Sequence, residues 1–339
     1  MRFTLHTDFE SLAPHAGAWN ELLTHAVTDA PFLHFEYLRD WWLTLGGGEW
    51  SQASLCIVTA HEGEELLGIA PLFHAANRDG QPALLLLGSI EISDYLDLIV
   101  RPADLPRFLS GLLDFLASSL PQSWSALDFY NVPQSSASIA ALETESAARG
   151  WNFTQEIFQP APFISLPADF ETYLAGIDKK QRHEIRRKMR RAAEHEVPAR
   201  FVIVEDPATL DAEMDGFFAL MTQDPAKAAF LTEPMRAQIL STARTAMQKG
   251  WLWLAFLEVG GKKAAAMFNF DYGNRLWGYN SGVNRDFIEL SPGWVLLGHV
   301  IQWACEHGRT ELDFMRGNEE YKYRFGAKDR AVMRVKVAR

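Results

Sequence analysis

The sequence predicts an α/β fold of the α+β kind, with two domains in tandem. Each domain is expected to hold a mixed, mostly antiparallel sheet flanked by helices. Three observations support this prediction. The chain has 339 residues, enough for two domains of ordinary size. Its hydrophobic content of 48% is typical of large buried cores rather than of disorder. Finally, the order of expected elements in the first half recurs in the second half.

The repeat begins with a strand, a tight turn and a second strand. Residues 54–73 read SLCIVTAHEGEELLGIAPLF and contain a Glu-Gly turn, whereas residues 251–270 read WLWLAFLEVGGKKAAAMFNF and contain a Gly-Gly turn. A segment that mixes acidic and aromatic residues follows in both halves, SDYLDL at 93–98 and RDFIEL at 285–290. Each copy of the repeat is therefore expected to begin with a β-hairpin.

A helix and a short strand complete each copy. Apolar residues at helical spacing predict helices over 103–120 and 291–308. Each helix precedes a strand around Leu-Asp-Phe, SALDFYN at 125–131 and TELDFMRGN at 310–318. Hairpins followed by a strand–helix–strand unit give mixed sheets with helices on their faces. A chance likeness of short apolar motifs is the alternative, and the shared order of four elements argues against it.

The domain boundary is expected near EIFQPAPF at 155–162. This places an N-terminal domain at 1–158 and a C-terminal domain at 159–339. The C-terminal domain contains a basic helix at 178–195, where Asp178 is the candidate N-cap.

That basic helix contrasts with the rest of the chain. It holds eight basic and three acidic residues, while the whole chain has a net charge of −11. Arg182, Arg186 and Arg190 recur at i, i+4 spacing and form one ridge. The ridge is either a solvated face or a binding site for the phosphates of a ligand or of nucleic acid. The overall acidity argues against broad, non-specific nucleic-acid binding.

The composition excludes several other classes of protein. There is no apolar segment typical of a signal peptide and none of the roughly 20 residues that a membrane span needs. Cys56 and Cys305 stand among apolar neighbours and are expected to be buried free thiols. The ten His residues lack metal-ligand spacing, so no metal is expected. A cytoplasmic enzyme or binding protein fits these features.

Two stretches of the second half carry candidate chemistry. Ser291, Pro292 and Gly293 start a helix whose free N–H groups suit an anion, although Ser-Pro also starts many purely structural helices. Strand 311–315 runs into RGNEEYKYRFG, which crowds cationic and hydroxyl side chains at a strand end. Such a cluster suits an oxyanion or phosphate. The alternative is that its Lys and Arg side chains only cap a short helix.

These segments carry a family resemblance. DFMRGNEEYKYRFGA at 313–327, SPGWVLLGHVIQWACEHG at 291–308 and IDKKQRHEIRRKMRR at 177–191 resemble the CelD-like branch of the GNAT acyltransferase superfamily. GIAPLF and SDYLDLIV in the first half are similar to that branch too. The two-GNAT-domain architecture is similar to that of the FemABX aminoacyltransferases, which agrees with the repeat.

The resemblance implies direct transfer of an acyl group from acyl-CoA, acetyl-CoA or longer, to an amine. The acceptor would be a small molecule or a cell-envelope or polysaccharide precursor. The second domain would hold the donor along a splayed strand at 276–282, which includes Asn280, with the pyrophosphate at Ser291, Gly293 and Trp294 and with Arg316 assisting. The turn keeps a single Gly, unlike the usual Arg/Gln-x-x-Gly-x-Gly/Ala pattern of the family, which puts ordinary CoA binding in doubt.

The resemblance also suggests roles for single residues. Lys322 would stabilise the oxyanion or hold the donor, and Tyr321 would protonate the leaving group. Asp313 or Asp94 would act as the base. Asp94, Tyr95 and Asp97 of the first domain would contact the acceptor, while Arg182 and Arg186 would bind substrate anions.

Two other functions stay open at this point. One is a FemABX-like transferase that uses aminoacyl-tRNA, which the basic helix favours and the net acidity does not. The other is a GNAT-fold binding module without catalysis, which the reduced glycine turn allows.

Overall fold

The computed structural model describes residues 1–50 and 52–339 and contains two compact units. Unit 1 comprises Met1–Pro160 together with Ala331–Arg339, and unit 2 comprises Ala161–Arg330. The chain passes from unit 1 to unit 2 after Pro160. The structure differs at the C-terminal end, because residues 331–339 belong to unit 1 and not to the second domain.

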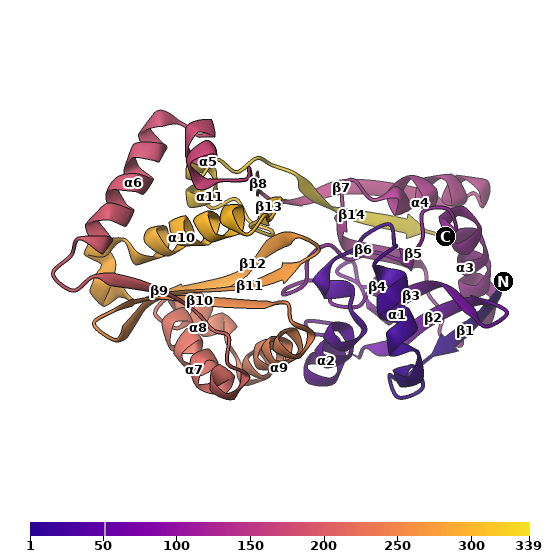
Figure 1. The fold of residues 1–339 in the computed structure, drawn as a ribbon. Coiled ribbons are helices and arrows are strands. Elements are labelled where there is room, and N and C mark those ends of the chain that lie inside the picture. The colour runs from indigo at the N-terminus through magenta and orange to yellow at the C-terminus, as the bar shows by residue number, and fades with distance from the viewer. Residues whose placement is uncertain (51) are drawn as a thin grey trace. The chain divides into compact units, whose positions relative to one another are not determined.

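Unit 1 is built on an eight-stranded sheet (Figure 1). Its strand order is β1-β2-β3-β4-β6-β14-β7, and β5 pairs with β3. The ladder between β4 and β6 is parallel and the others are antiparallel. The elements are β1 (Arg2–His6), η1 (Ala13–His15), α1 (Ala16–Leu23), η2 (Pro31–Leu33), α2 (Phe35–Leu45), β2 (Ser54–Glu62), β3 (Glu65–Ala76), β4 (Pro82–Leu86), β5 (Ile99–Val100), α3 (Leu105–Ser119), β6 (Ala126–Pro133), α4 (Ala137–Ala148), β7 (Asn152–Pro160) and β14 (Ala331–Ala338).

Unit 2 is built on a six-stranded sheet in the order β8-β13-β12-β11-β10-β9. Its ladder between β12 and β13 is parallel and the other ladders are antiparallel. The elements are β8 (Phe163–Ser165), α5 (Phe170–Gly176), α6 (Lys179–Ala193), β9 (Ala199–Ile203), η3 (Pro207–Thr209), α7 (Leu210–Met221), α8 (Pro225–Phe230), α9 (Glu233–Lys249), β10 (Leu252–Val259), β11 (Lys262–Tyr272), β12 (Arg275–Val283), η4 (Arg285–Leu290), α10 (Pro292–Glu306), β13 (Glu311–Asp313) and α11 (Glu320–Arg324).

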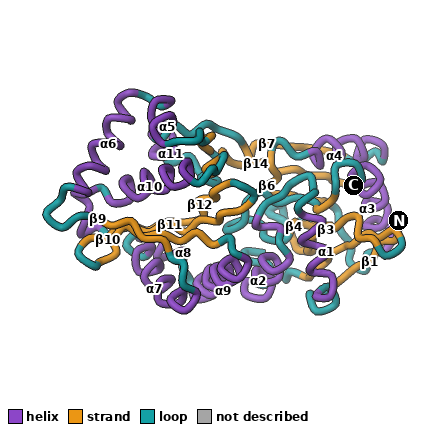
Figure 2. Tube along the Cα trace, in the orientation of Figure 1, coloured by secondary structure: helices purple, strands orange, loops and turns teal. Residues whose placement is uncertain are grey.

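Helices cover both faces of the unit 2 sheet (Figures 1 and 2). On one face, α10 carries a wide apolar stripe, and Val300 shares a buried cluster with Leu257 of β10 and Ile185 of α6. On the other face, α7 lies so close to β12 that a Cβ atom at Gly282 would be 2.6 Å from the backbone of Leu220. The prediction of mixed, mostly antiparallel sheets flanked by helices is confirmed.

The return of β14 to unit 1 has a clear physical basis. Its sequence, AVMRVKVA, alternates buried valines with half-buried basic residues, the pattern of a strand with one face in a core. Its two antiparallel ladders join it to β6 and to β7. Since both partners lie in unit 1, the last strand completes the first sheet.

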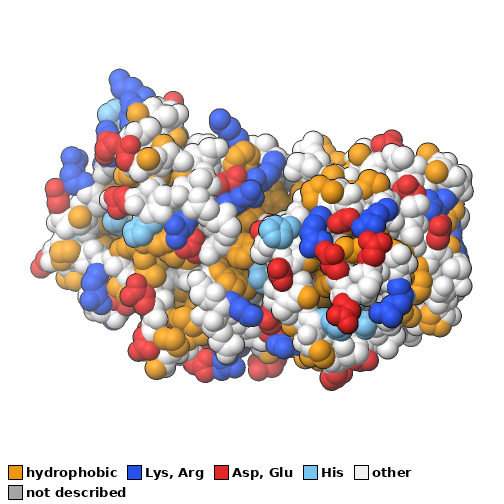
Figure 3. All heavy atoms as spheres, turned by 45° about the vertical axis from the view of Figure 1, so that its right-hand side comes forward, with side chains coloured by type: hydrophobic (Ala, Val, Ile, Leu, Met, Phe, Trp, Pro, Cys, Tyr) orange, Lys and Arg blue, Asp and Glu red, His pale blue; other side chains and the backbone are white. Residues whose placement is uncertain are grey.

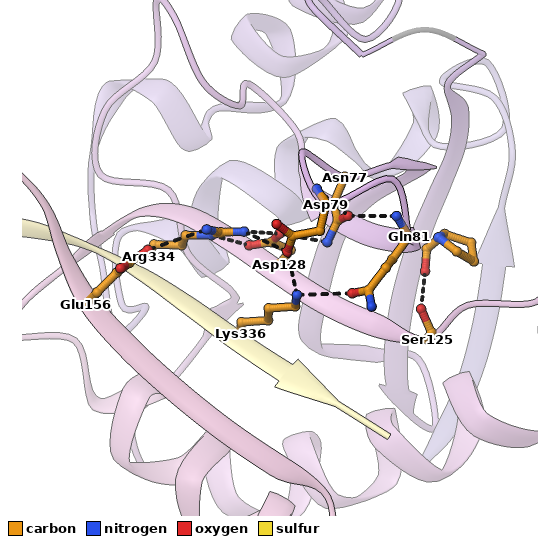
Figure 4. A network of polar contacts seen from close by, with 9 residues as sticks. Asn77, Asp79, Gln81, Ser125, Asp128, Glu156, Arg334 and Lys336 are labelled. Carbon is orange, nitrogen blue, oxygen red and sulfur yellow. Dashed lines mark hydrogen bonds and ion pairs between the residues drawn. The ribbon is translucent and has the colours of Figure 1, made fainter.

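A polar network also holds β14 in place (Figure 4). Arg334 donates to the fully buried Asp128 of β6 through Nε at 2.9 Å and Nη2 at 2.8 Å. The amide of Asn77 donates to the same carboxylate at 3.0 Å. Lys336 pairs with Asp79 at 2.6 Å. These bonds satisfy a carboxylate that would otherwise be buried at high cost.

Charged side chains of both signs are interspersed over the face drawn in Figure 3. Within the part of the chain that the structure describes, no helix combines the length and the apolar character that crossing a membrane requires.

Candidate functional site

The sheet of unit 2 opens between β12 and β13. Although β12 runs from Arg275 to Val283, its ladder with β13 involves only residues 275–277. A bulge interrupts the ladder on the other side of β12, because Asn269 of β11 pairs with Gly278 while Phe268 pairs with Asn280. A bulge bends the strand that carries it. Residues 278–283 therefore leave β13 and pair, among the described strands, with β11 alone, in the region where the resemblance places a splayed strand.

A lysine that the sequence did not single out reaches this divergent stretch. Lys227 of α8 donates from Nζ to Asn280 Oδ1 at 3.1 Å and to the Ser281 carbonyl at 2.5 Å. Burial lowers the pKa of Lys227, and the carboxylates of Asp224 and Glu319 oppose that shift. Lys227 lies in the segment PAKAAF, which contains no motif, so no local signal could have identified it.

The first turn of α10 lies at the end of β12. A Cβ atom at Gly293 would be 3.0 Å from Val283 Cγ2, so the missing side chain lets the helix approach the strand. Ser291 occupies the N-cap position that the sequence assigns to it, but with φ of 52°. Its side chain makes no capping hydrogen bond within the described residues, contrary to the expectation of an ordinary cap.

Trp294 adds a hydrogen-bond donor to this turn. Its indole Nε1 is buried and has no hydrogen-bond partner in the described chain. The ring packs on Phe325 with centroids 4.7 Å apart, and Lys188 Nζ of α6 lies 4.0 Å from its centre. Arg191 of α6 comes within 3.5 Å of Ser291 Oγ. The start of α10 thus combines helix N–H groups, an unpartnered indole N–H and two cations.

The loop after β13 is organised around Lys322. The side chain is only 3% exposed, and its Nζ lies 3.4, 3.0 and 3.2 Å from the carbonyl oxygens of Met315, Arg316 and Gly317. The carboxylate of Glu319 completes its surroundings at 2.9 Å. An ammonium has three N–H bonds, so its donors are fully used in this geometry. The structure thus gives Lys322 the role of holding the loop closed, beside any catalytic role.

Glu319 is the accessible partner of Lys322. Its side chain is 57% exposed, while the ammonium beneath it is buried. Burial opposes the ionisation of Glu319, but the hydrogen bond and charge of Lys322 outweigh it and lower the pKa of the carboxyl. Glu319 also interacts electrostatically with Lys227, which connects this loop to the divergent part of β12.

Tyr321 and Asp313 differ in their surroundings. Tyr321 is 41% exposed, and desolvation together with the charge of Glu319 raises the pKa of its hydroxyl. The hydroxyl therefore stays protonated at neutral pH, as a proton donor requires. Asp313 is fully buried, pairs with Arg330 and accepts a hydrogen bond of 2.7 Å from the backbone N–H of Met315. Its carboxylate is thus engaged in the structure of the loop, where Arg316 lies half-buried.

The predicted ridge on α6 makes structural contacts. Arg182 lies 3.5 and 3.4 Å from the carbonyls of Leu174 and Ala175 at the end of α5, and Arg186 pairs with Glu171. It is instead Lys188 and Arg191, on the same helix, that reach the start of α10. Helical spacing could have suggested these two residues only if the packing of α6 on α10 had been known.

The residues predicted in unit 1 are all buried. Asp94, Tyr95 and Asp97 are 4%, 4% and 1% exposed. Asp97 accepts hydrogen bonds from Thr28 Oγ1 at 2.6 Å, from the Leu98 N–H at 2.8 Å and from Ser136 Oγ. Burial raises the pKa of Asp97, and these bonds oppose the shift. The segment that the sequence assigns to the acceptor is thus engaged in internal contacts.

The structure brings most of the predicted unit 2 residues together in two groups. Lys322, Tyr321, Arg316 and Asp313 share the loop after β13, and Ser291, Gly293 and Trp294 share the start of α10. The contact between Trp294 and Phe325 links the two groups. As for metals, no group of three or more His, Cys, Asp or Glu side chains in residues 1–50 and 52–339 is suitably placed to hold an ion.

Comparison with known proteins gives a family match within the second half and solved structures that share the fold of the whole chain. Residues 179–323 match the family described as "Acetyltransferase (GNAT) domain". No protein with curated annotation matches.

Three solved structures share the fold. FemX is 11% identical with a TM-score of 0.64, covering 98% of this chain and 97% of FemX. A conserved protein of unknown function from Bacteroides thetaiotaomicron VPI-5482 is 12% identical with a TM-score of 0.59, covering 100% of both chains. The C-terminal DUF2156 domain of a putative lysylphosphatidylglycerol synthetase from Agrobacterium fabrum is 12% identical with a TM-score of 0.55, covering 96% and 91%. The predicted likeness to FemABX-type architecture is confirmed at the level of the fold.

Proposed function

We propose that the protein is an N-acyltransferase, on the premise that residues 179–323 match the family described as "Acetyltransferase (GNAT) domain". Its donor is acyl-CoA, with an acetyl or a longer acyl group. Its acceptor is an amine of a small molecule or of a cell-envelope or polysaccharide precursor. The amine nitrogen bonds to the carbonyl carbon, the carbon–sulfur bond breaks, and the proton lost by the amine balances the one taken up by the thiolate.

The observation that carries this proposal is the opening of the sheet beside the start of α10. The acyl end of the donor is proposed to lie along residues 278–283 of β12, and its phosphates at residues 291–294. The unpartnered Nε1 of Trp294 fits an anionic acceptor, and Lys188 and Arg191 supply positive charge. These contacts support a phosphate site despite the single glycine of the turn.

The loop after β13 supplies the proposed proton-transfer groups. Tyr321 is the proposed proton donor to the leaving thiolate, and its hydroxyl carries a proton at neutral pH. Glu319 is a better candidate base than Asp313, because its carboxylate is exposed although it pairs with Lys322, whereas Asp313 is fully buried and paired with Arg330. Lys322 can stabilise an oxyanion only when Glu319 gives up its place beside the ammonium.

One observation favours the aminoacyl-tRNA alternative. A pocket of about 720 Å³ between α6 and α11 is lined by Lys180, His183, Arg187 and Arg324, together with Gln181, Glu184 and Glu320. Such a basic hollow can receive phosphates of a nucleotide or of tRNA. Two of its cations are already paired, Arg187 with Glu184 and Arg324 with Glu320, which reduces its attraction for a polyanion.

The proposal is tested by adding acetyl-CoA and, separately, total aminoacyl-tRNA to the purified protein and measuring the melting temperature. A ligand at 100 times its dissociation constant stabilises a protein by about 2.7 kcal/mol. We expect stabilisation by acetyl-CoA and acyl transfer to at least one amine of a panel. A shift with tRNA alone would favour the alternative. If acetyl-CoA binds but no amine is acylated, the result would favour a GNAT-fold binding module without catalysis.

A further inference from the structure

Unit 1 contains a pocket of about 400 Å³ on one face of strands β1 and β2. Strand alternation puts Arg2, Thr4 and His6 on the same face of β1. The antiparallel register sets Arg2 opposite His61 and Thr4 opposite Thr59. The remaining lining residues are His15, Gly63 and Glu64. Phe3, which points to the other face of β1, packs 6.0 Å from Phe108 of α3, so that helix covers the opposite side.

The pocket gathers basic groups and hydroxyls. One guanidinium and three imidazoles line it, against the single carboxylate of Glu64. The rings of His15 and His61 are 5.9 Å apart. His6 shares hydrogen bonds with Thr59 Oγ1 at 3.0 Å and with Ser11 Oγ at 3.3 Å. His61 Nδ1 is buried and makes no hydrogen bond to any described residue. A buried polar atom without a partner is uncommon and points to a missing ligand or water.

The imidazoles disfavour one another's protonation. Burial and then the charge of His15 lower the pKa of His6, while Asp8 raises it and His61 lowers it further. Burial, His15 and Arg2 lower the pKa of His61. A bound anion would oppose each of these effects, because it stabilises the protonated rings.

We propose that this pocket binds a small tetrahedral dianion, such as the phosphate group of a monoester. Arg2 supplies a permanent charge, the two threonines supply hydroxyl donors, and His15 and His61 become donors at both nitrogens when protonated. A protonated His6 donates to Thr59 and Ser11 and adds its charge to the pocket. The unpartnered Nδ1 of His61 gains an acceptor in the bound state. The site lies wholly within unit 1 and does not depend on acyl transfer.

The proposal predicts that affinity rises as pH falls. The anion raises the pKa of His6 and His61, so binding takes up protons and is tighter below about pH 6.5. Each pKa unit gained by one histidine strengthens binding by up to about tenfold. Glu64 and Asp8 work against the anion at every pH at which they are ionised.

Sulfate is the appropriate first probe, since it stays a dianion between pH 5 and 8, so that any change of affinity comes from the protein. We would follow the imidazole C2 protons of the full chain by NMR during sulfate titrations at pH 5.5 and pH 8, and repeat them with glycerol phosphate. We expect saturable shifts in His6, His15 and His61, with affinity at least tenfold tighter at pH 5.5. Arg2→Gln and His61→Gln should each weaken binding at least tenfold.

His25→Gln is the matched control, because His25 lies outside the pocket lining, and this variant should bind sulfate like the wild type. The proposal is overturned by an absence of saturable shifts in the wild type, by equal affinity at the two pH values, or by unchanged binding in Arg2→Gln and His61→Gln. Shifts caused by Zn²⁺ but not by sulfate would also overturn it and would indicate a metal site. Acyl transfer is measured separately, so either proposal can fail alone.

Discussion

At the scale of single residues, the loop after β13 shows how one buried ammonium can organise a site. Three backbone carbonyls and one carboxylate surround Lys322. The loop contains Met315 at φ of 62° and Gly317 at φ of 112°, both in the left-handed region. Such backbone persists only where the surroundings fix it. Catalysis and loop stability are therefore coupled through Lys322, and Glu319 is the partner that can be changed without opening the loop.

Replacing Lys322 and Glu319 separates these two roles. Lys322→Met leaves buried carbonyls without donors, so we expect the free energy of unfolding to fall by about 1–3 kcal/mol and acyl transfer to be lost. Glu319→Gln keeps the loop carbonyls satisfied and removes the proposed base. We expect a smaller loss of stability than in Lys322→Met, because the amide oxygen can still accept from the buried ammonium although the ion pair is lost. Single-turnover transfer should fall by about 10²-fold.

Glu320→Gln is the control, because Glu320 is an exposed neighbour whose carboxylate pairs with Arg324 and not with Lys322 in the described chain. It should retain both melting temperature and rate. If Glu319→Gln also transfers acyl groups at the wild-type rate, the base lies elsewhere.

Trp294 provides a test of the donor site at one atom. Trp294→Phe removes the unpartnered Nε1 and keeps an aromatic ring between Phe325 and Lys188. A hydrogen bond to a charged acceptor is worth about 1.5–3 kcal/mol, so we expect CoA to bind about 10- to 100-fold more weakly by calorimetry. Trp303→Phe, further along α10, is the matched control. Equal loss of affinity in both variants would point to a general effect on the helix.

At the scale of elements, turn residues and periodicity identified the two hairpins and the helices of the repeat. The expected helices at 103–120 and 291–308 appear as α3 and α10, and the two hairpins appear as β2–β3 and β10–β11. Asp178 caps α6 by accepting from the N–H groups of Lys180 and Gln181, as its position indicated. The opening between β12 and β13 depends on a bulge and on a short ladder, and neither leaves a pattern in composition. Lys227 contacts the strand at that opening, so its place in the site could not be predicted from the sequence either.

The buried His299 of α10 should make the stability of the protein depend on pH. His299 packs its ring on Phe201 with centroids 5.3 Å apart, and burial lowers its pKa. A histidine whose pKa is lower in the folded state takes up its proton more readily when unfolded. Its stabilising effect is thus complete above the unfolded pKa of about 6.5 and declines as pH falls below that value. Chemical denaturation at pH 7.5 and 5.5 should show this loss, and His299→Gln should make it smaller. An unchanged pH dependence in the variant would assign it to other groups.

At the scale of the whole molecule, the chain leaves unit 1 after Pro160 and returns to it at Ala331. The sequence could not show this return, because strand partners far apart in the chain are chosen by the final packing and not by local pattern. The repeat predicted two units in tandem, whereas β14 lies between β6 and β7 of the first sheet and has no counterpart in that repeat. We therefore expect the folding of unit 1 to require residues 331–339.

Removing β14 tests this dependence. Deleting residues 331–339 leaves β6 and β7 without their shared partner and Asp128 without Arg334, which donates to it at two positions. A buried carboxylate that loses its partner costs about 3–5 kcal/mol, and the lost ladders and valines add to this. Calorimetry should then show that the transition of unit 1 is lost or moved to much lower temperature. Unit 2 has its own sheet and core, so its thermal transition should persist, and acetyl-CoA should still raise the temperature of that transition if the donor site lies there.

Arg334→Met is a milder change than the deletion, because it keeps strand β14 while removing the ion pair with Asp128. Its melting temperature should fall between those of the wild type and of the shortened chain. A shortened chain that keeps both transitions at their wild-type temperatures would show that unit 1 folds without β14.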